Sequence, residues 1–110
     1  MEARLEINAG ICGFRTTVRA TGNDEQAVSF AIESDCEKIQ NLATQLKGHE
    51  PIDSLREIDP VGQSVLLTTA RECLKGCCAG CVVPVGLFKG LQVAAGLALP
   101  KDIGIQITTA

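Results

Sequence analysis

The chain has 110 residues, the size of one ordinary domain, and no shift in composition divides it. Its net charge is −3 and its basic residues are scattered, and the 3 Phe are accompanied by no Tyr or Trp. Nucleic-acid binding is disfavoured, because it needs a basic surface and commonly uses aromatic side chains for stacking. We therefore expect a single cysteine-containing domain over residues 1–110, with no nucleic-acid partner.

Three runs in the first part of the sequence alternate polar and apolar residues: 3–8, 14–20 and 27–33. An alternation with one apolar face predicts antiparallel strands that are covered on one side only. Gly10 and Gly13 bracket the first connection, and Gly22-Asn23-Asp24 predicts a hairpin turn at the second. The positions expected to face inward are Ala3, Leu5, Ile7, Phe14, Thr16, Val18, Ala20, Val28, Phe30 and Ile32.

Three helices are expected next. Ser34-Asp35-Cys36-Glu37 has the pattern of a capping box, which predicts a helix from Ser34 to Gly48. Residues 49–63 are predicted to form a loop with at most one short turn. A second helix is expected over residues 64–75, and Pro84 is expected to open a third that ends near Leu99.

The chain ends with a further alternating run, in which Ile103, Ile105 and Ile107 follow Pro100. This run predicts a fourth strand. The order β-β-β-α-α-α-β then predicts an α+β fold of two layers. We expect a three-stranded antiparallel meander plus a fourth C-terminal strand, with the helices packed on one face.

The location of the protein is also an expectation from sequence. The opening residues MEARL show neither the basic nor the apolar region of a secretory signal, so we expect a cytoplasmic protein with reduced thiols. The apolar stretch 82–99 contains Pro84, Lys89 and Gln92, which favours a buried core helix over a membrane span. No membrane partner is therefore expected.

Cysteines carry the strongest chemical signal. Of the 6 in the chain, four lie in the segment CLKGCCAGC, at positions 73, 77, 78 and 81. The spacing of Cys78 and Cys81 occurs in zinc knuckles, iron–sulfur sites and redox loops alike. Cys12 lies in a glycine-flanked turn. Cys36 lies at a helix start, where the helix dipole favours thiolate, and Cys81 precedes the Pro84 helix, where the effect is weaker.

Other readings of these residues remain open. Cys73 lies on the apolar stripe of its predicted helix, which favours a core residue over a ligand. The adjacent Cys77 and Cys78 cannot both readily point the same way, so one of them is a spare thiol, a group that supports the ligands without binding the metal, or a ligand to a larger cluster. His49 is expected to be a solvated loop residue. No catalytic constellation, phosphate loop or dinucleotide fingerprint is present.

Four motifs together resemble a family of small uncharacterised proteins of anaerobic bacteria and archaea, a domain of unknown function. They are Cys12-Gly13-Phe14, Ser34-Asp35-Cys36-Glu37, Cys81-Val82-Val83-Pro84 and the segment from Gly96 to Asp102. Members of that family tend to carry histidine at the position of Cys78 and often proline at that of Val82. A His/Cys exchange is what a metal ligand tolerates. The resemblance therefore implies Cys12, Cys36, Cys78 and Cys81 as the ligand set.

The sequence supports three hypotheses. The first is a small protein that holds an iron–sulfur cluster, or zinc as the alternative, through cysteines 12, 36, 78 and 81, with Cys77 as a further candidate metal ligand. Such a protein would meet a redox or cluster-transfer protein partner. The second is a thiol/disulfide redox protein using Cys78 and Cys81. The third is a structural interaction module, a homodimer included, that docks through the small residues of the third helix.

Overall fold

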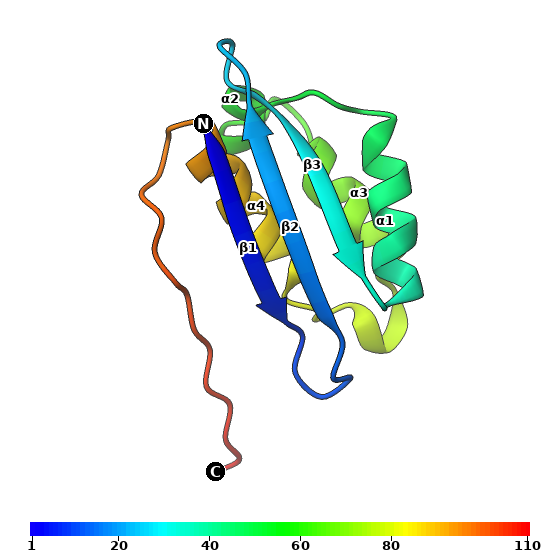
Figure 1. The fold of residues 1–110 in the computed structure, drawn as a ribbon. Coiled ribbons are helices and arrows are strands. Elements are labelled where there is room, and N and C mark those ends of the chain that lie inside the picture. Colours follow the sequence, from blue (N-terminus) through cyan, green and yellow to red (C-terminus); the bar gives the residue numbers. More distant parts are fainter.

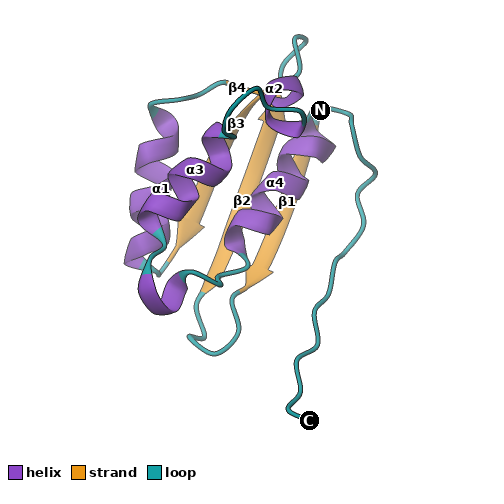
Figure 2. Ribbon diagram, turned by 180° about the vertical axis from the view of Figure 1, so that it is seen from behind, coloured by secondary structure: helices purple, strands orange, loops and turns teal.

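The computed structural model describes all 110 residues and has an α+β fold, with a four-stranded antiparallel sheet and helices packed on one of its faces (Figures 1 and 2). In chain order the elements are β1 (Glu2–Asn8), β2 (Arg15–Gly22), β3 (Ala27–Ser34), α1 (Glu37–Lys47), β4 (Ile52–Asp53), α2 (Ser54–Ile58), α3 (Val65–Cys73), the 3₁₀ turn η1 (Gly76–Cys78) and α4 (Val83–Ala94).

The sheet has the order β1-β2-β3-β4, so consecutive strands are neighbours. Its register pairs Leu5 with Val18, and Val18 with Ile32. The three predicted strands are thus confirmed within two residues at each end. Of the positions predicted to face inward, Val18, Ala20, Val28 and Phe30 are buried in the core between the sheet and the helices. Phe14 lies before the start of β2 and is 41% exposed. The prediction that Phe14 faces inward is wrong, because Phe14 belongs to the β1–β2 loop and β2 begins only at Arg15.

The fourth strand is not where the sequence predicted it. Residues 101–110, which we call the C-terminal arm, have no secondary structure and are exposed throughout. The fourth strand is instead β4, which lies inside the predicted loop 49–63 and pairs Ile52 with Val28. The order is therefore β-β-β-α-β-α-α-α, with β4 between helices. Two residues are too few to show a strand periodicity, which is why the sequence did not reveal β4.

The helices differ from prediction mainly at their ends. The first begins at Glu37 with Cys36 as its N-cap, and the cap has no side-chain hydrogen bond, so the predicted capping box is wrong. Ser64 does cap α3, where its Oγ accepts a hydrogen bond from the backbone N–H of Leu67 at 3.0 Å. The third predicted helix corresponds to α4, which starts one residue before Pro84 but ends at Ala94 rather than near Leu99.

A buried carboxylate in α2 also supports α3. Glu57 is only 4% exposed and accepts hydrogen bonds from the Ser64 hydroxyl at 2.7 Å and from the backbone N–H groups of Val65 and Leu66 at 2.8 and 2.7 Å. Free N–H groups at a helix start need such acceptors. Sequence analysis assigned this region to a loop and gave Glu57 no role.

Helix α4 lies close against β1 because its facing positions are glycines. A Cβ on Gly90 would lie 2.6 Å from Cδ1 of Leu5, and one on Gly86 would lie 2.6 Å from Cδ1 of Ile7. The segment Gly76–Ala94 is long and apolar enough to cross a membrane by length and composition alone. Here α4 contributes Leu87 and other buried side chains to the core. Gly86 and Gly90 thus serve packing within the domain, whereas a Cβ on Gly96 would meet open space.

Candidate metal centre

Five of the six cysteines come from segments that meet at one end of the sheet, the lower end in Figure 1. β1 and β3 end there and β2 begins there, so the β1–β2 loop and the β3–α1 junction lie at the same edge. The turn η1 and the start of α4 reach this end from the helical layer (Figures 1 and 2). The topology therefore brings together cysteines that are up to 69 residues apart in sequence, from Cys12 to Cys81.

Cys12 lies in the tight loop between β1 and β2. The backbone N–H of Gly13 donates to the carbonyl of Gly10 at 2.9 Å, and both glycines have positive φ, 74° and 89°. Residues other than glycine adopt such angles at a cost, so these positions fix the shape of the loop. Cys12 is exposed and so is the neighbouring Ile11, which leaves the thiol open to solvent at the tip of the hairpin.

Cys36 lies between β3 and α1. Its carbonyl accepts the N–H of Gln40 at 2.9 Å, and its own N–H donates to the Oγ of Ser34 at 3.1 Å. Ser34 Oγ also accepts a hydrogen bond from the Thr16 hydroxyl at 3.0 Å, on the neighbouring strand. This bond holds Ser34 in the sheet, which explains why it does not cap the helix. Cys36 is half-buried and packs against the core.

The segment after α3 presents three cysteines on a short turn. The N–H of Ala79 donates to the carbonyl of Gly76, and the N–H of Cys81 to the carbonyl of Cys78, both at 3.1 Å. Cys77 is exposed, whereas Cys78 and Cys81 are half-buried and pack against the core. The two adjacent cysteines thus differ in exposure, and Cys78 is the one turned toward the body of the domain.

Two basic side chains hold this turn in place. Lys38 in α1 donates from Nζ to the carbonyl of Lys75 at 3.0 Å, and Arg71 in α3 donates to the carbonyl of Ala79 at 3.4 Å. The sequence analysis gave neither residue a role, because nothing in the sequence indicates which loop a surface lysine or arginine will reach.

The electrostatics of Cys81 report on its neighbours. Burial is the largest influence and raises the pKa of the Cys81 thiol, while a hydrogen bond with the backbone of Val83 lowers it. The pKa is raised further by the like charges of three other thiolates, those of Cys12, Cys36 and Cys78. Like charges act in this way only at short range. Cys12, Cys36 and Cys78 therefore lie near enough to Cys81 for their charges to affect it.

The raised pKa of Cys81 corrects one expectation from the sequence, and the arrangement of the side chains limits what the site can hold without movement. The helix start was expected to favour the Cys81 thiolate, but burial and like charge outweigh the hydrogen bond and the pKa is raised. No three His, Cys, Asp or Glu side chains are arranged so that they could hold a metal ion. The four cysteines thus gather at one end of the domain without forming a finished coordination shell.

The remaining candidates lie apart from this group. Cys73 ends α3, and its sulfur accepts a hydrogen bond from Asn41 Nδ2 at 3.7 Å. Burial, and then the charge of Glu72, raises the pKa of Cys73, and its side chain packs against the core, in line with the expected packing role. His49 is exposed and follows the C-terminal end of α1, whereas Cys36 lies at its start.

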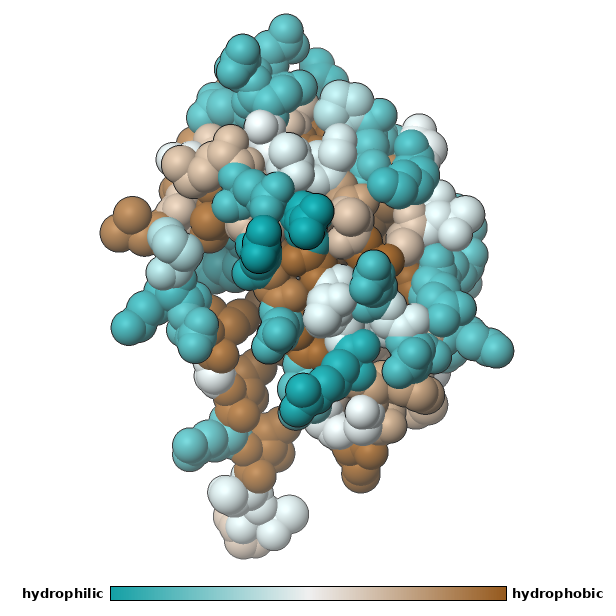
Figure 3. Space-filling model, viewed as in Figure 1, coloured by the Kyte–Doolittle hydropathy of each residue, from teal (hydrophilic) through white to brown (hydrophobic).

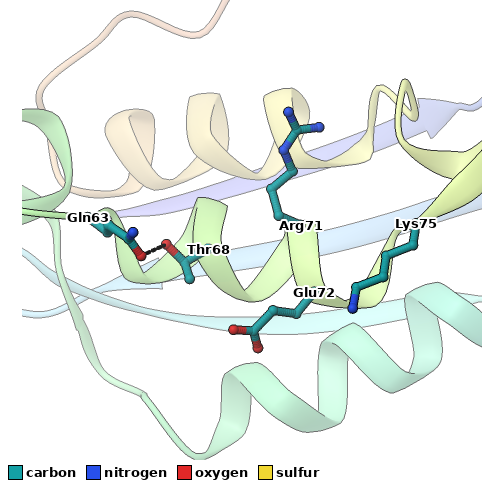
Figure 4. A pocket seen from close by; sticks show the side chains of 5 residues that line it. All are labelled: Gln63, Thr68, Arg71, Glu72 and Lys75. Atoms are coloured by element: carbon teal, nitrogen blue, oxygen red, sulfur yellow. Dashed lines mark hydrogen bonds between the residues drawn. The ribbon is translucent and has the colours of Figure 1, made fainter.

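A shallow hollow on α3 is a separate feature. It has a volume of about 360 Å³, and Figure 4 shows Arg71, Glu72 and Lys75 around it, with Thr68 donating a hydrogen bond to Gln63 at 3.2 Å. No hydrophobic residue lines it. Sites for small organic ligands are mostly apolar and enclosed, so this hollow is a poor candidate for one.

Comparison with known families agrees with the resemblance seen in the sequence. The model of a family of unknown function, DUF6951, matches residues 3–107. The chain belongs to this family. Membership in DUF6951 covers nearly all of the domain, including most of the C-terminal arm, and names no activity. No curated protein and no solved structure matches the chain.

Proposed function

We propose that this DUF6951 protein is a small metal-binding protein that holds an iron–sulfur cluster through the thiolates of Cys12, Cys36, Cys78 and Cys81. The observation that carries the proposal is that these four cysteines lie on segments that meet at one end of the sheet (Figure 1). The raised pKa of Cys81, to which the charges of the other three contribute, is consistent with this arrangement. Four thiolates held at this end would repel one another, and a cationic metal centre would convert that repulsion into attraction.

The side chains must move to complete such a site. Around Gly10, Gly13, Gly76 and Gly80 there is open space, with no atom within 4 Å of a Cβ placed on them. The two loops that carry Cys12 and Cys78 thus have room to adjust, while Cys36 is fixed at the start of α1. Thiolates are soft ligands, which suit iron–sulfur clusters and zinc. Cluster function would be electron transfer, cluster carriage or redox sensing in a cytoplasmic setting, with a redox or cluster-transfer partner.

The proposal is tested by preparing the protein without oxygen and measuring iron, acid-labile sulfide, zinc and the visible absorption spectrum. We expect iron and sulfide in near-equal amounts, with charge-transfer absorption that is lost when cysteines 12, 36, 78 and 81 are all replaced by serine. Cys73→Ser is the matched control and retains the absorption. A wild-type protein that is colourless and metal-free even after treatment with iron and sulfide would refute the proposal. A four-serine variant that still carries the cluster would refute the ligand set.

A second candidate function is thiol/disulfide redox chemistry of Cys78 and Cys81. The turn closed by the hydrogen bond from the Cys81 N–H to the Cys78 carbonyl at 3.1 Å supports it, because it keeps the two residues close. In this chemistry both thiols lose a proton and an electron to a disulfide oxidant such as oxidised glutathione, which is reduced to two thiols. Titration in a glutathione redox series distinguishes the two functions. A metal-free protein with one reversible two-electron transition would favour the disulfide.

A further inference from the structure

One edge of the sheet is open along its whole length. β1 is the first strand in the order and has 7 residues, with β2 on one side and no strand on the other. Met1 and Gly22 exchange hydrogen bonds in both directions, so they form a hydrogen-bonded pair of the β1–β2 ladder. Because such pairs alternate in antiparallel sheets, the backbone N–H and C=O groups of Glu2, Arg4, Glu6 and Asn8 point outward. No hydrogen bond involves these backbone groups.

The opposite edge of the sheet, along β3, is covered over much of its length and so differs from the β1 edge. β4 pairs with the first two residues of β3, and beyond it side chains replace a strand. Glu50 accepts the N–H of Phe30 at 2.7 Å, and Lys47 donates to the Phe30 carbonyl at 2.8 Å. Proteins cover or interrupt sheet edges because free edges pair with other chains. The β1 edge has no such protection at any point along its length.

The apolar side chains on the inner face of β1 are also only partly covered. Ala3 is buried on the inner face of β1, but Leu5 and Ile7, the next inward residues, are only half-buried. Both contact α4 at its glycines, and no element covers them from the outer side. A strand added beside β1 would cover these two side chains as well as pairing its backbone.

The C-terminal arm has the matching pattern. Ile103, Ile105 and Ile107 alternate with polar or small residues and are 52%, 69% and 88% exposed. The arm makes no hydrogen bond within the chain. Figure 3 shows its apolar side chains along the lower left of the molecule, standing clear of the polar sheet face. An extended backbone with one apolar face is a strand that lacks its neighbour.

The arm is not paired as a fifth strand of its own sheet. It runs on the β1 side and its tip reaches beyond the β1–β2 loop (Figure 1). The molecule is 44 Å long but only 27 and 26 Å across. The last isoleucine, Ile107, is 88% exposed, whereas the free edge of a second copy would offer it apolar and hydrogen-bonding groups. The family match extends to residue 107, so it covers the arm as far as its last isoleucine.

We propose that two copies of this chain exchange their C-terminal arms, each arm adding as a strand to the outer edge of β1 in the other copy. The exchange is reciprocal about a two-fold axis, so both edges and both arms are used and the assembly closes as a dimer. Isoleucines 103, 105 and 107 then face the helical layer beside Leu5 and Ile7. The proposal is independent of the cysteine site.

Light scattering after gel filtration of the full chain tests the exchange. At about 0.1 mM, where an interface of micromolar affinity is saturated, we expect a dimer. A chain that ends at Pro100 is expected to be a folded monomer. Ile105→Asp is expected to raise the dimer dissociation constant at least about tenfold, because it places a charge on the buried face of both arms. Val61→Asp, at an exposed loop residue, is the matched control and leaves the dimer unchanged.

Mixing two variants separates arm exchange from other dimers. Glu6→Pro removes one outward N–H from β1 but leaves the ladder to β2 intact, so this variant has an arm and a damaged edge. Mixed with the chain that ends at Pro100, it is expected to form a heterodimer through one arm on one edge. A monomeric full chain at 0.1 mM, or a dimer that survives truncation at Pro100, overturns the proposal. If Glu6→Pro does not fold, the truncation and Ile105→Asp decide alone.

Discussion

At the scale of single residues, Cys81 is where the geometry of the cysteine group can be measured. Burial and then the thiolates of Cys12, Cys36 and Cys78 raise its pKa in the folded protein. The raised pKa means that the native thiol keeps its proton to higher pH than in the unfolded chain, and a protonated thiol does not react with iodoacetamide. We therefore predict that the pH midpoint for alkylation of Cys81, followed by mass spectrometry in metal-free protein, is higher in native protein than in urea.

The contribution of the neighbours to this shift has its own test. Replacing Cys36 with serine removes one nearby like charge, so the native midpoint of Cys81 is expected to fall toward the value in urea. Cys73 does not act on Cys81, so Cys73→Ser is expected to leave the midpoint in place. If the native midpoint of Cys81 is the same in wild type, Cys36→Ser and Cys73→Ser, then Cys36 and Cys81 are farther apart than in the structure.

A second prediction at this scale concerns Glu57. Three hydrogen bonds end on its buried carboxylate. Glu57→Ala leaves the hydroxyl of Ser64 and two N–H groups of α3 without an acceptor, and we predict a loss of about 3 kcal/mol in the free energy of unfolding. Urea denaturation measures the change. Glu72→Ala, at an exposed position of α3, is the control and is expected to stay within about 0.5 kcal/mol of wild type.

At the scale of elements, the sequence predicted the strands that show a clear periodicity. It did not predict features that depend on contacts with other segments of the chain. β1 to β3 were predictable because each shows period two over seven or eight residues. The alternation of Ile103 to Ile107 is equally clear, yet no strand forms within the chain, because the arm does not pair with the free edge of β1. The capping box failed for the same reason: Thr16, on another strand, binds Ser34.

The cysteine site also has features that the sequence could predict and features that depend on the fold. Cys78 and Cys81 stand out in sequence by their spacing. Cys12 was a candidate because of its glycine-flanked turn and Cys36 because of its helix start, and the resemblance to the family implied these four as the ligand set. That the four are neighbours follows from the shared sheet end, which depends on strand order and cannot be derived from spacing. The roles of Lys38 and Arg71 in holding the turn could not have been predicted, because both depend on which carbonyls the fold presents.

The close contact between β2 and α4 gives a prediction for an element pair. A Cβ on Gly22 would lie 2.9 Å from the carbonyl carbon of Ala94, and backbone cannot rotate away as a side chain can. Gly22→Ala must therefore push the end of α4 off the sheet, and we predict a loss of about 2 kcal/mol in the free energy of unfolding. Gly80→Ala, with open space around the Cβ, is expected to be neutral in the same urea titration. A neutral Gly22→Ala would mean that α4 ends farther from β2.

At the scale of the whole molecule, the proposed metal centre would connect parts that the fold joins only loosely. Its four cysteines belong to the β1–β2 loop, the start of α1, the turn η1 and the approach to α4. Packing inside the domain relies on residues such as Leu42, Leu66 and Leu87, and the cysteines lie at the rim of that core. Metal binding at the rim would thus hold the sheet, α1 and α4 together at this end of the domain.

This arrangement predicts that cluster loading stabilises the domain as a whole. A ligand that binds only the folded state at a concentration well above its dissociation constant adds a few kcal/mol, and the thiols of the unfolded chain, spread over 70 residues from Cys12 to Cys81, cannot reproduce the site. We predict a Tm about 10 °C higher in reconstituted than in metal-free protein, measured anaerobically by circular dichroism. Cys36→Ser is expected to abolish the increase and Cys73→Ser to retain it. An increase that persists in Cys36→Ser would place the metal elsewhere, because Cys36 is the proposed ligand at the junction of the sheet and α1.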